Sequence, residues 1–246
     1  MELKRWHDYA KIFKDVLGLT HSPVAINCIQ DKEFDVGQNK IRICRSILDA
    51  AAGKSLKINK QNNACFGASW HLGFQNIKDP KIIDMIKQFV VEGEKLFCSY
   101  EALDNLVAQM DPVPDNSKAC FVLTPLDNIE FEPELIIFVL NPEQACRLLT
   151  LVTFVDGNMP KIKIGGPTCR MAVMYPLFTQ EVNISFQDST ARKICKMDEN
   201  LLFVSIPAKR IPQIVESIDK CSAGTAKIEY PKGFREFLQK RQANKR

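Results

Sequence analysis

Two cysteines lie in segments that contain glycine, and their thiol groups could take part in chemistry. Cys65 precedes Gly67 by two residues, and Cys169 follows Gly166 by three. Glycine lets the backbone approach a partner closely, and a thiol held there can be a metal ligand or a nucleophile. No standard catalytic signature surrounds either cysteine. We therefore expect the two segments to form the walls of a site whose reaction, if it has one, the sequence does not specify.

The chain holds nine cysteines, an odd and large number for a protein in a reducing compartment. We treat them as reduced thiols. No two of them form a Cys-x-x-Cys pair, so the local signature of a zinc ribbon, a thioredoxin site or a ferredoxin loop is missing. Any shared site must therefore be assembled by folding. The alternative is that most of the nine are small buried hydrophobic side chains.

Length and hydropathy favour a protein with a substantial core that lies outside the membrane. The chain has 246 residues, which is enough for one large domain. Its longest apolar runs, such as residues 135–140, are far shorter than the roughly 20 residues that a membrane span requires. The first eight residues carry charge where a signal peptide would need an apolar stretch. We expect a cytoplasmic protein.

The net charge of +4 is concentrated at the C-terminus. Residues 232–246 carry six basic side chains and one acidic one, a local charge of +5, which leaves −1 for the rest of the chain. A solvated tail explains this pattern better than a nucleic-acid-binding arm, so no nucleic-acid partner is expected. We divide the chain into a single domain over residues 1–231 and a basic C-terminal helix or tail over residues 232–246.

Hydrophobic periodicity predicts several helices in the N-terminal part of the chain. Cys44 falls on the apolar face of one of them, so its side chain is expected to point inward. A proline opens the expected strand, and glycines close two of the helices. The predicted elements are a helix over residues 4–17, a strand over 21–29, and helices over 41–51, 64–72 and 80–93.

The second half of the chain contains an internal repeat of one pattern. Residues 137–149 and residues 202–215 each read as a buried strand, a proline and a helix. Proline presets the backbone angle of the first helical turn, which explains its place after each strand. Further strands are expected over residues 119–124 and 182–187. We therefore predict a single α+β domain, with α/β as the alternative, in which a mixed sheet and the two strand-Pro-helix units pack against several N-terminal helices.

Five short motifs also occur in order along the chain. They are Ile43-Cys44-Arg45 with Gly53, Cys65-Phe66-Gly67-Ala68 with Leu72-Gly73-Phe74, Phe131-Glu132-Pro133-Glu134 with Asn141-Pro142, Cys169 with Tyr175-Pro176, and Asp198-Glu199 with Ile206-Pro207. In this order they resemble the family filed as domain of unknown function 169, over roughly residues 20 to 220. That family is frequent in archaea and anaerobic bacteria and has no settled activity. The resemblance supports a single domain.

The resemblance also implies a set of site residues. Carried over position by position, the family pattern matches this chain at Cys44, Cys65, Gly67, Gly73, Cys169, Pro176 and Arg192. In many members a further cysteine precedes the arginine, whereas here no cysteine occurs before Cys195. If the family site has four thiolates, Asp188 or Cys195 must complete it in this chain.

Thiolates are soft ligands suited to an iron–sulfur cluster or zinc. On cysteine abundance and the resemblance, we expect Cys44, Cys65 and Cys169, with Cys195 or Asp188, to hold an iron–sulfur cluster, zinc being the alternative. Gly67, Gly166 and Arg192 are expected to contact the cofactor. The role would lie in redox or cofactor metabolism, with a redox partner or a small anionic ligand. The sequence leaves a homodimer open.

A cysteine-dependent enzyme, or a carrier for a small anion, is the second interpretation. Cys65 near a helix start would have a lowered pKa, but His71 lies over one turn away on a different face, so direct pairing is not expected. Residues 161–168 offer lysines and glycines without the spacing of a phosphate-binding loop. Arg170 and Arg192 have the planar guanidinium group that suits a carboxylate or phosphate.

Overall fold

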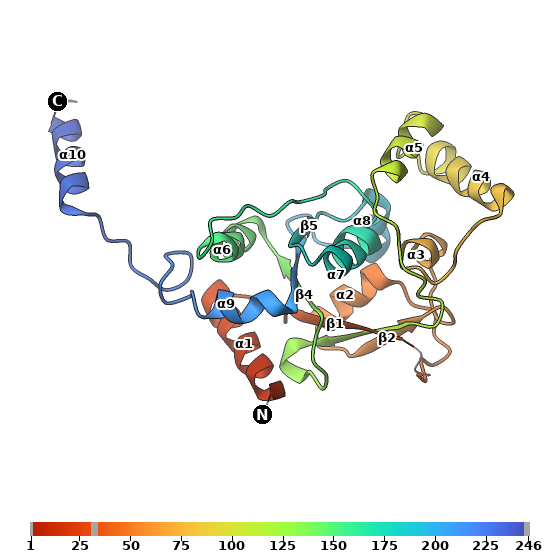
Figure 1. Ribbon diagram of the computed structural model, residues 1–246, viewed down its shortest axis with the longest axis horizontal. Coiled ribbons are helices and arrows are strands. Elements are labelled where there is room, and N and C mark those ends of the chain that lie inside the picture. The colour runs from red at the N-terminus through yellow and green to blue at the C-terminus, as the bar shows by residue number, and fades with distance from the viewer. Residues whose placement is uncertain (1, 31–33, 244–246) are drawn as a thin grey trace.

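The centre of the fold is a sheet with helices on both faces (Figure 1). The structure is a computed structural model that describes residues 2–30 and 34–243. Within these residues six strands follow one another across the sheet in the order β2-β3-β1-β4-β6-β5. Their bounds are Val24–Ile29 (β1), Leu56–Asn59 (β2), Cys120–Pro125 (β3), Leu135–Leu140 (β4), Asn183–Ser185 (β5) and Leu202–Pro207 (β6).

The α+β class is confirmed, but the expected mixed sheet is wrong, since every pair of named strands is antiparallel. A parallel bridge between Ile41 and Asn63 lies outside these strands. The reason is the path between β4 and β6. After its helix the chain does not return directly to a parallel neighbour; it first runs through two helical segments, β5 and a further helix. As a result β6 enters beside β4 from the opposite end.

In the N-terminal part, the observed helices agree with those that hydrophobic periodicity predicted. The two predicted strand-Pro-helix units are also confirmed. Asn141 caps the helix after β4, accepting a hydrogen bond from Gln144 N at 2.9 Å, and proline follows in the first turn. The helices are α1 Glu2–Leu17, α2 Ile43–Ala51, α3 Phe66–His71, α4 Pro80–Gln88, α5 Tyr100–Ala108, α6 Pro142–Thr153, α7 Tyr175–Thr179, α8 Ser189–Cys195, α9 Ile211–Val215 and α10 Lys232–Ala243. Short segments of other pitch are η1 Phe89–Gly93, η2 Leu126–Asn128, η3 Cys169–Met174 and η4 Ala208–Arg210.

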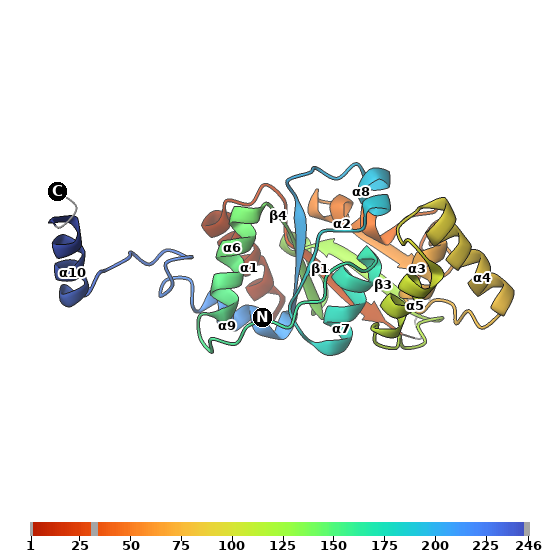
Figure 2. The same ribbon diagram turned by 90° about the horizontal axis from the view of Figure 1, so that it is seen from above.

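The two faces of the sheet carry separate cores, because successive side chains of a strand point to opposite faces. On β4, Ile136 and Phe138 pack with α1, α6 and α9, whereas Ile137 and Val139 pack with α2, α3 and η3. Figure 2 shows the two groups of helices on opposite sides of the sheet. Burial on both faces explains why the central strands read as continuous apolar runs.

Two elements stand apart from this body. The hairpin of α4 and α5 projects at one end, and α4 has no buried residue. At the other end an extended segment leads to α10, which lies away from the sheet in both views. Residues 244–246 of the predicted tail lie outside the described residues. Among the residues described, no helix is long and apolar enough to cross a membrane.

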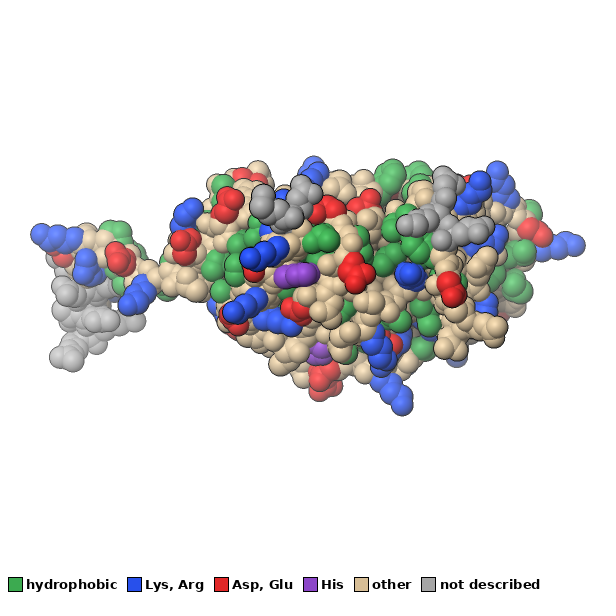
Figure 3. Space-filling view, turned by 90° about the horizontal axis from the view of Figure 1, so that it is seen from below, with side chains coloured by type: hydrophobic (Ala, Val, Ile, Leu, Met, Phe, Trp, Pro, Cys, Tyr) green, Lys and Arg blue, Asp and Glu red, His purple; other side chains and the backbone are tan. Residues whose placement is uncertain are grey.

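Charge of both signs is spread over the surface shown in Figure 3, with apolar side chains between. No continuous basic surface covers the body on that face, while basic side chains also occur on the projecting arm.

Candidate thiol site

Two cysteines that are far apart in the sequence meet where α2 and α8 pack. Cys44 lies in the first turn of α2 and Cys195 ends α8, and their Sγ atoms are 3.4 Å apart. Arg45 holds the two helices together, since its Nη1 donates to the carbonyl of Cys195 at 2.9 Å. Both thiols are buried, as periodicity predicted for Cys44. Their contact raises the pKa of Cys44 and lowers that of Cys195, so Cys195 is the more acidic of the two.

Cys169 lies close to this pair. It is the first residue of the π-helical segment η3 and is buried. Burial raises the pKa of Cys169 well above its ordinary value, and the neighbouring Cys65, Asp188 and Cys44 raise it further. These groups therefore lie within electrostatic range of its sulfur atom. Turns of π-helix occur frequently at functional sites.

Cys65 stands just before α3, at the N-cap position and partly buried. Asn63 fixes its backbone from both sides: the N–H of Cys65 donates to Asn63 Oδ1 at 3.1 Å, and Asn63 Nδ2 donates to the carbonyl of Cys65 at 2.7 Å. Gly67 lies inside α3, and a Cβ there would meet nothing within 4 Å. A bound group would therefore find open space beside Gly67.

Asp188 joins two of the cysteine-bearing segments. One carboxylate oxygen caps α8 by accepting from Ala191 N at 2.7 Å, and the other accepts from the backbone N and the Oγ1 of Thr168 at 3.2 and 3.1 Å. Thr168 directly precedes Cys169, so this pairing positions Cys169 against α8. Because both oxygens are engaged, the geometry favours Cys195 over Asp188 as a fourth ligand. The role of Thr168 was not predicted, because its partner is 20 residues away.

Two of the other predicted cofactor contacts have structural partners. The guanidinium of Arg192 donates to the carbonyls of Phe186, Asp198 and Leu201 at 2.8, 2.7 and 3.0 Å, and so ties α8 to the segments that precede and follow it. Gly166 packs against Met171, whose terminal methyl carbon would lie 2.6 Å from an added Cβ. The structure thus places both residues beside the site as supports.

Two polar side chains near the site were not predicted to belong to it. Burial and the nearby Arg170 together lower the pKa of His71 to about 4, against a smaller opposite effect of Asp188, so the ring is neutral at physiological pH. Gln187 directly precedes Asp188 in a left-handed backbone conformation (φ 60°). Both polar atoms of its side chain are buried without a hydrogen-bond partner. A buried orphan amide is unusual in a folded protein, and a single glutamine gives no signal in sequence.

A family model described as "Uncharacterised ArCR", the domain of unknown function 169, matches residues 12–217. The chain belongs to this family. A similar protein is "Uncharacterized protein MJ0308" of Methanocaldococcus jannaschii, which is 24% identical over 228 residues that cover 89% of this chain and 96% of the relative. No solved structure gives a significant match. The region shared with the domain of unknown function 169 contains all four thiols of the site, whereas α10 lies beyond it.

The separation of the thiol pair can be compared with the sulfur–sulfur distance at a metal ion. Two thiolates on a tetrahedral zinc ion with Zn–S bonds near 2.3 Å lie about 3.8 Å apart, close to the observed 3.4 Å. Across residues 2–30 and 34–243, no group of three or more His, Cys, Asp or Glu is close enough to hold a metal ion. Cys65 and Cys169 would therefore have to move toward the pair. Alternatively, Cys44 and Cys195 could lose two protons and two electrons to an oxidant and form a disulfide.

Proposed function

We propose that this protein binds a soft metal centre through Cys44, Cys65, Cys169 and Cys195, and that the centre is an iron–sulfur cluster, with zinc as the alternative. The observation that carries the proposal is the 3.4 Å contact between the sulfur atoms of Cys44 and Cys195, with Cys169 within electrostatic range of Cys44 and Cys65. Thiolate is the ligand preferred by both centres. An iron–sulfur cluster would supply one-electron transfer, in redox or cofactor metabolism with a redox partner.

A metal ion would change the protonation state of these thiols. Burial and neighbouring acidic groups make the thiolate of Cys169 unfavourable, and the contact with Cys195 does the same for Cys44. A bound metal ion reverses this, because coordination deprotonates a thiol outright. Cys221 is also buried, and it packs in the apolar core with α1 and α6. Cys120 is buried in β3 and lies within electrostatic range of the Cys28 thiol.

The first test is isolation without oxygen. We expect the anaerobically purified protein to be brown, to show the visible absorption of an iron–sulfur cluster, and to contain iron and sulfide. Zinc in place of iron would support the alternative centre. A colourless, metal-free protein with every thiol reduced, which also fails to take up iron and sulfide or zinc when they are supplied, would rule out the proposal.

The second test assigns the ligands. Replacing Cys44, Cys65, Cys169 or Cys195 with serine, one at a time, is expected to lower metal occupancy about tenfold or more, since each change removes a thiolate. Cys98→Ser and Cys146→Ser are matched controls, because both cysteines are exposed. They should keep wild-type metal content. Full metal content in all four site variants would show that other residues hold the centre.

A further inference from the structure

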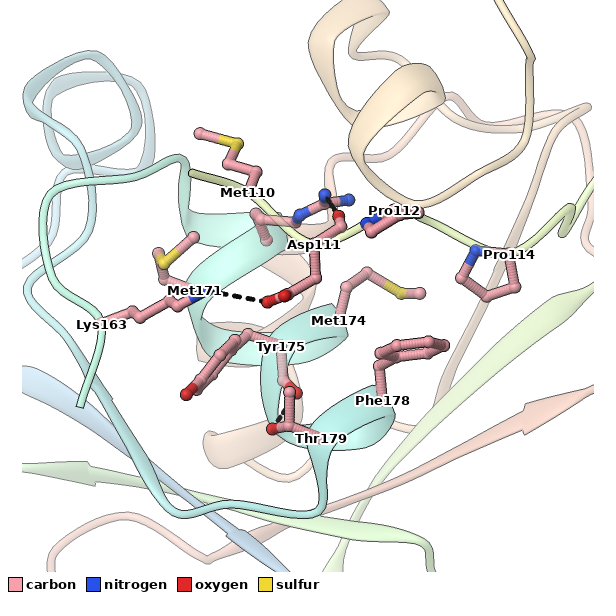
Figure 4. A pocket seen from close by; sticks show the side chains of 11 residues that line it. Met110, Asp111, Pro112, Pro114, Lys163, Met171, Met174, Tyr175, Phe178 and Thr179 are labelled. Atoms are coloured by element: carbon pink, nitrogen blue, oxygen red, sulfur yellow. Dashed lines mark hydrogen bonds and ion pairs between the residues drawn. The ribbon is translucent and has the colours of Figure 1, made fainter. Parts of the chain in front are cut away.

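A cleft outside the thiol site has room for a small molecule. It lies between the end of β1, the segment that precedes β4, the stretch of η3 and α7, and the start of η4, and its volume is about 510 Å³. Sites for small molecules in proteins measure roughly 300–1,000 Å³. The cavity drawn in Figure 4 measures only about 10 Å³, which is room for about one water molecule. None of the four thiols of the proposed metal centre lines the larger cleft.

Segments from three motifs of the family resemblance meet at this cleft. Its lining includes the end of the motif over residues 131–134 and the positions that directly follow Tyr175-Pro176 and Ile206-Pro207. The backbone joins two of these segments, since the N–H of Ala208 donates to the carbonyl of Glu134 at 3.0 Å. These motifs therefore share a position in the fold that the thiol site does not explain.

Glu134 presents a fixed carboxylate to the cleft. Strand β1 continues to Ile29, but its pairing with β4 ends where Ile26 lies opposite Leu135. Beyond that point the side chain of Glu134 takes the place of a neighbouring strand, because its Oε2 accepts from the N–H of Cys28 at 2.9 Å. The other oxygen, Oε1, has no hydrogen-bond partner among the described residues. That oxygen is free to accept a hydrogen bond from a ligand.

The opposite charge comes from Lys209. This lysine is exposed and follows Ala208 at the start of η4. No carboxylate in residues 2–30 and 34–243 pairs with its ammonium group, not even that of Glu134, although the backbone joins the two segments. Cys28 adds no charge to the cleft, because burial and the nearby Glu134 raise the pKa of its thiol to about 12. The described lining thus carries one negative and one positive charge, which do not pair with each other.

An apolar wall lies beside the two charges. Met174 is buried, Leu177 is half-buried, and Phe178 is 57% exposed. Figure 4 shows Met174 and Phe178 projecting to the same side of the helical stretch. Methionine adapts its shape to a bound group, and small-molecule sites combine such apolar walls with a few polar groups.

We infer that this cleft binds a free α-amino acid with an apolar side chain. Its ammonium group lies on Glu134 and its carboxylate on Lys209, so that each unpaired charge gains a partner. Its side chain packs against Met174, Leu177 and Phe178. A simple anion or a simple cation would satisfy only one of the two charges, and glycine would leave the apolar wall uncovered. The inference does not depend on the metal proposal, since the cleft and the thiol site share no residue.

Four probe compounds separate the three contacts. Titration calorimetry of the full chain should show saturable one-to-one binding of L-leucine. Isocaproate lacks the ammonium group of leucine, isoamylamine lacks the carboxylate, and glycine lacks the side chain. Each of these should bind at least about tenfold more weakly than leucine. Absence of saturable leucine binding would overturn the inference, and so would an analogue that binds as tightly as leucine.

Two substitutions test the charges one at a time. Glu134→Gln keeps an oxygen that can accept from the N–H of Cys28 but loses the negative charge, so it should weaken leucine binding about tenfold. Binding of isocaproate, which has no group for Glu134, should not weaken in this variant. Lys209→Gln should likewise weaken leucine binding about tenfold without weakening the binding of isoamylamine. A folding defect would weaken the binding of all three compounds together.

The matched controls are Glu216→Gln and Lys220→Gln, because both residues are exposed and lie outside the cleft. Both variants should bind leucine as the wild type does, and all four variants should keep the wild-type metal content. Equal weakening of leucine and isocaproate binding in Glu134→Gln would contradict the assignment of the ammonium group. A loss of leucine binding in the controls equal to that in Glu134→Gln and Lys209→Gln would contradict the site.

Discussion

The surroundings of each sulfur atom decide which cysteines of this chain can do chemistry. Cys98 and Cys146 are exposed, and Cys221 is packed in the apolar core with α1 and α6. Cys44 and Cys195 differ from these because their sulfur atoms touch. A buried thiol among aliphatic groups is inert, whereas two thiols in contact can share a metal ion or exchange electrons. Proximity to another thiol, more than burial, therefore marks the site.

His71 provides a prediction about pH. Its pKa falls from 6.5 to about 4 on folding, because burial and Arg170 disfavour the charged ring. The unfolded chain therefore takes up a proton that the folded chain does not, and stability is lost as the pH falls from about 6.5 to about 4. Because the ring is only partly buried, we expect a loss on the order of 1–2 kcal/mol.

Urea denaturation near pH 7.5 and near pH 4.5 measures this effect. His71→Gln cannot take up the proton, so the difference between the two pH values should shrink by the same amount in this variant. An unchanged pH dependence in His71→Gln would show that the folded protein protonates His71 normally.

At this scale the burial of Cys44 was predicted correctly, because helical periodicity placed its side chain on the inward face. The grouping of Cys65 and Cys169 in one site came from the family pattern and stays a prediction. Periodicity carries no information about the partner of Cys44, because Cys195 is 151 residues away. The buried charge of Arg170 was missed for the same reason: its surroundings come from residues 110–114 and from α3.

At the scale of elements, strong local signals gave the right answer. The two strand-Pro-helix units were predicted because β4 and β6 are buried along their whole length and a proline follows each. The antiparallel pairing of these strands was not predicted, because strand direction depends on the path of the chain between the strands. The helices α5 and α8 were not predicted, although Ser99 and Asp188 cap them with side-chain hydrogen bonds that are typical of helix starts.

Two glycines near α3 give opposite predictions for substitution by alanine. Gly73 has φ +78°, and a Cβ would lie 2.2 Å from the carbonyl oxygen of Pro114, so Gly73→Ala should cost roughly 2–4 kcal/mol of stability. Gly67 lies within the helix with nothing within 4 Å, so Gly67→Ala should stabilise by up to about 1 kcal/mol.

Thermal unfolding of both glycine variants measures the difference, and their metal content adds a second reading. If the open space beside Gly67 admits a bound group, Gly67→Ala should lose metal while its melting temperature holds or rises. A folded Gly73→Ala with wild-type stability would contradict the close approach of α3 to residues 113–116.

At the scale of the molecule, the body lies between two projecting elements. The α4–α5 hairpin at one end exposes Met85 and Phe89, and α10 at the other exposes Phe234 and Phe237. Helical periodicity predicts that such helix faces are apolar, but it does not predict which partner covers them. The homodimer that the sequence left open therefore stays a prediction.

Removing residues 230–246 tests whether the C-terminal arm belongs to the folding unit. The described side chains of α10 up to residue 237 are exposed, and their ring contacts are local, with Tyr230 and Phe234 at 5.6 Å and Phe234 and Phe237 at 6.2 Å. Residues 223–225 still bond to the body, through Arg147 and Ile218, so truncation after residue 229 leaves those contacts intact. We therefore expect the melting temperature to change by less than about 2 °C.

The truncated chain, near −1 in net charge, should no longer bind a cation exchanger. A fall of several degrees would instead show that the arm belongs to the folding unit, and a smaller assembly in light scattering would show that α10 packs on a second copy.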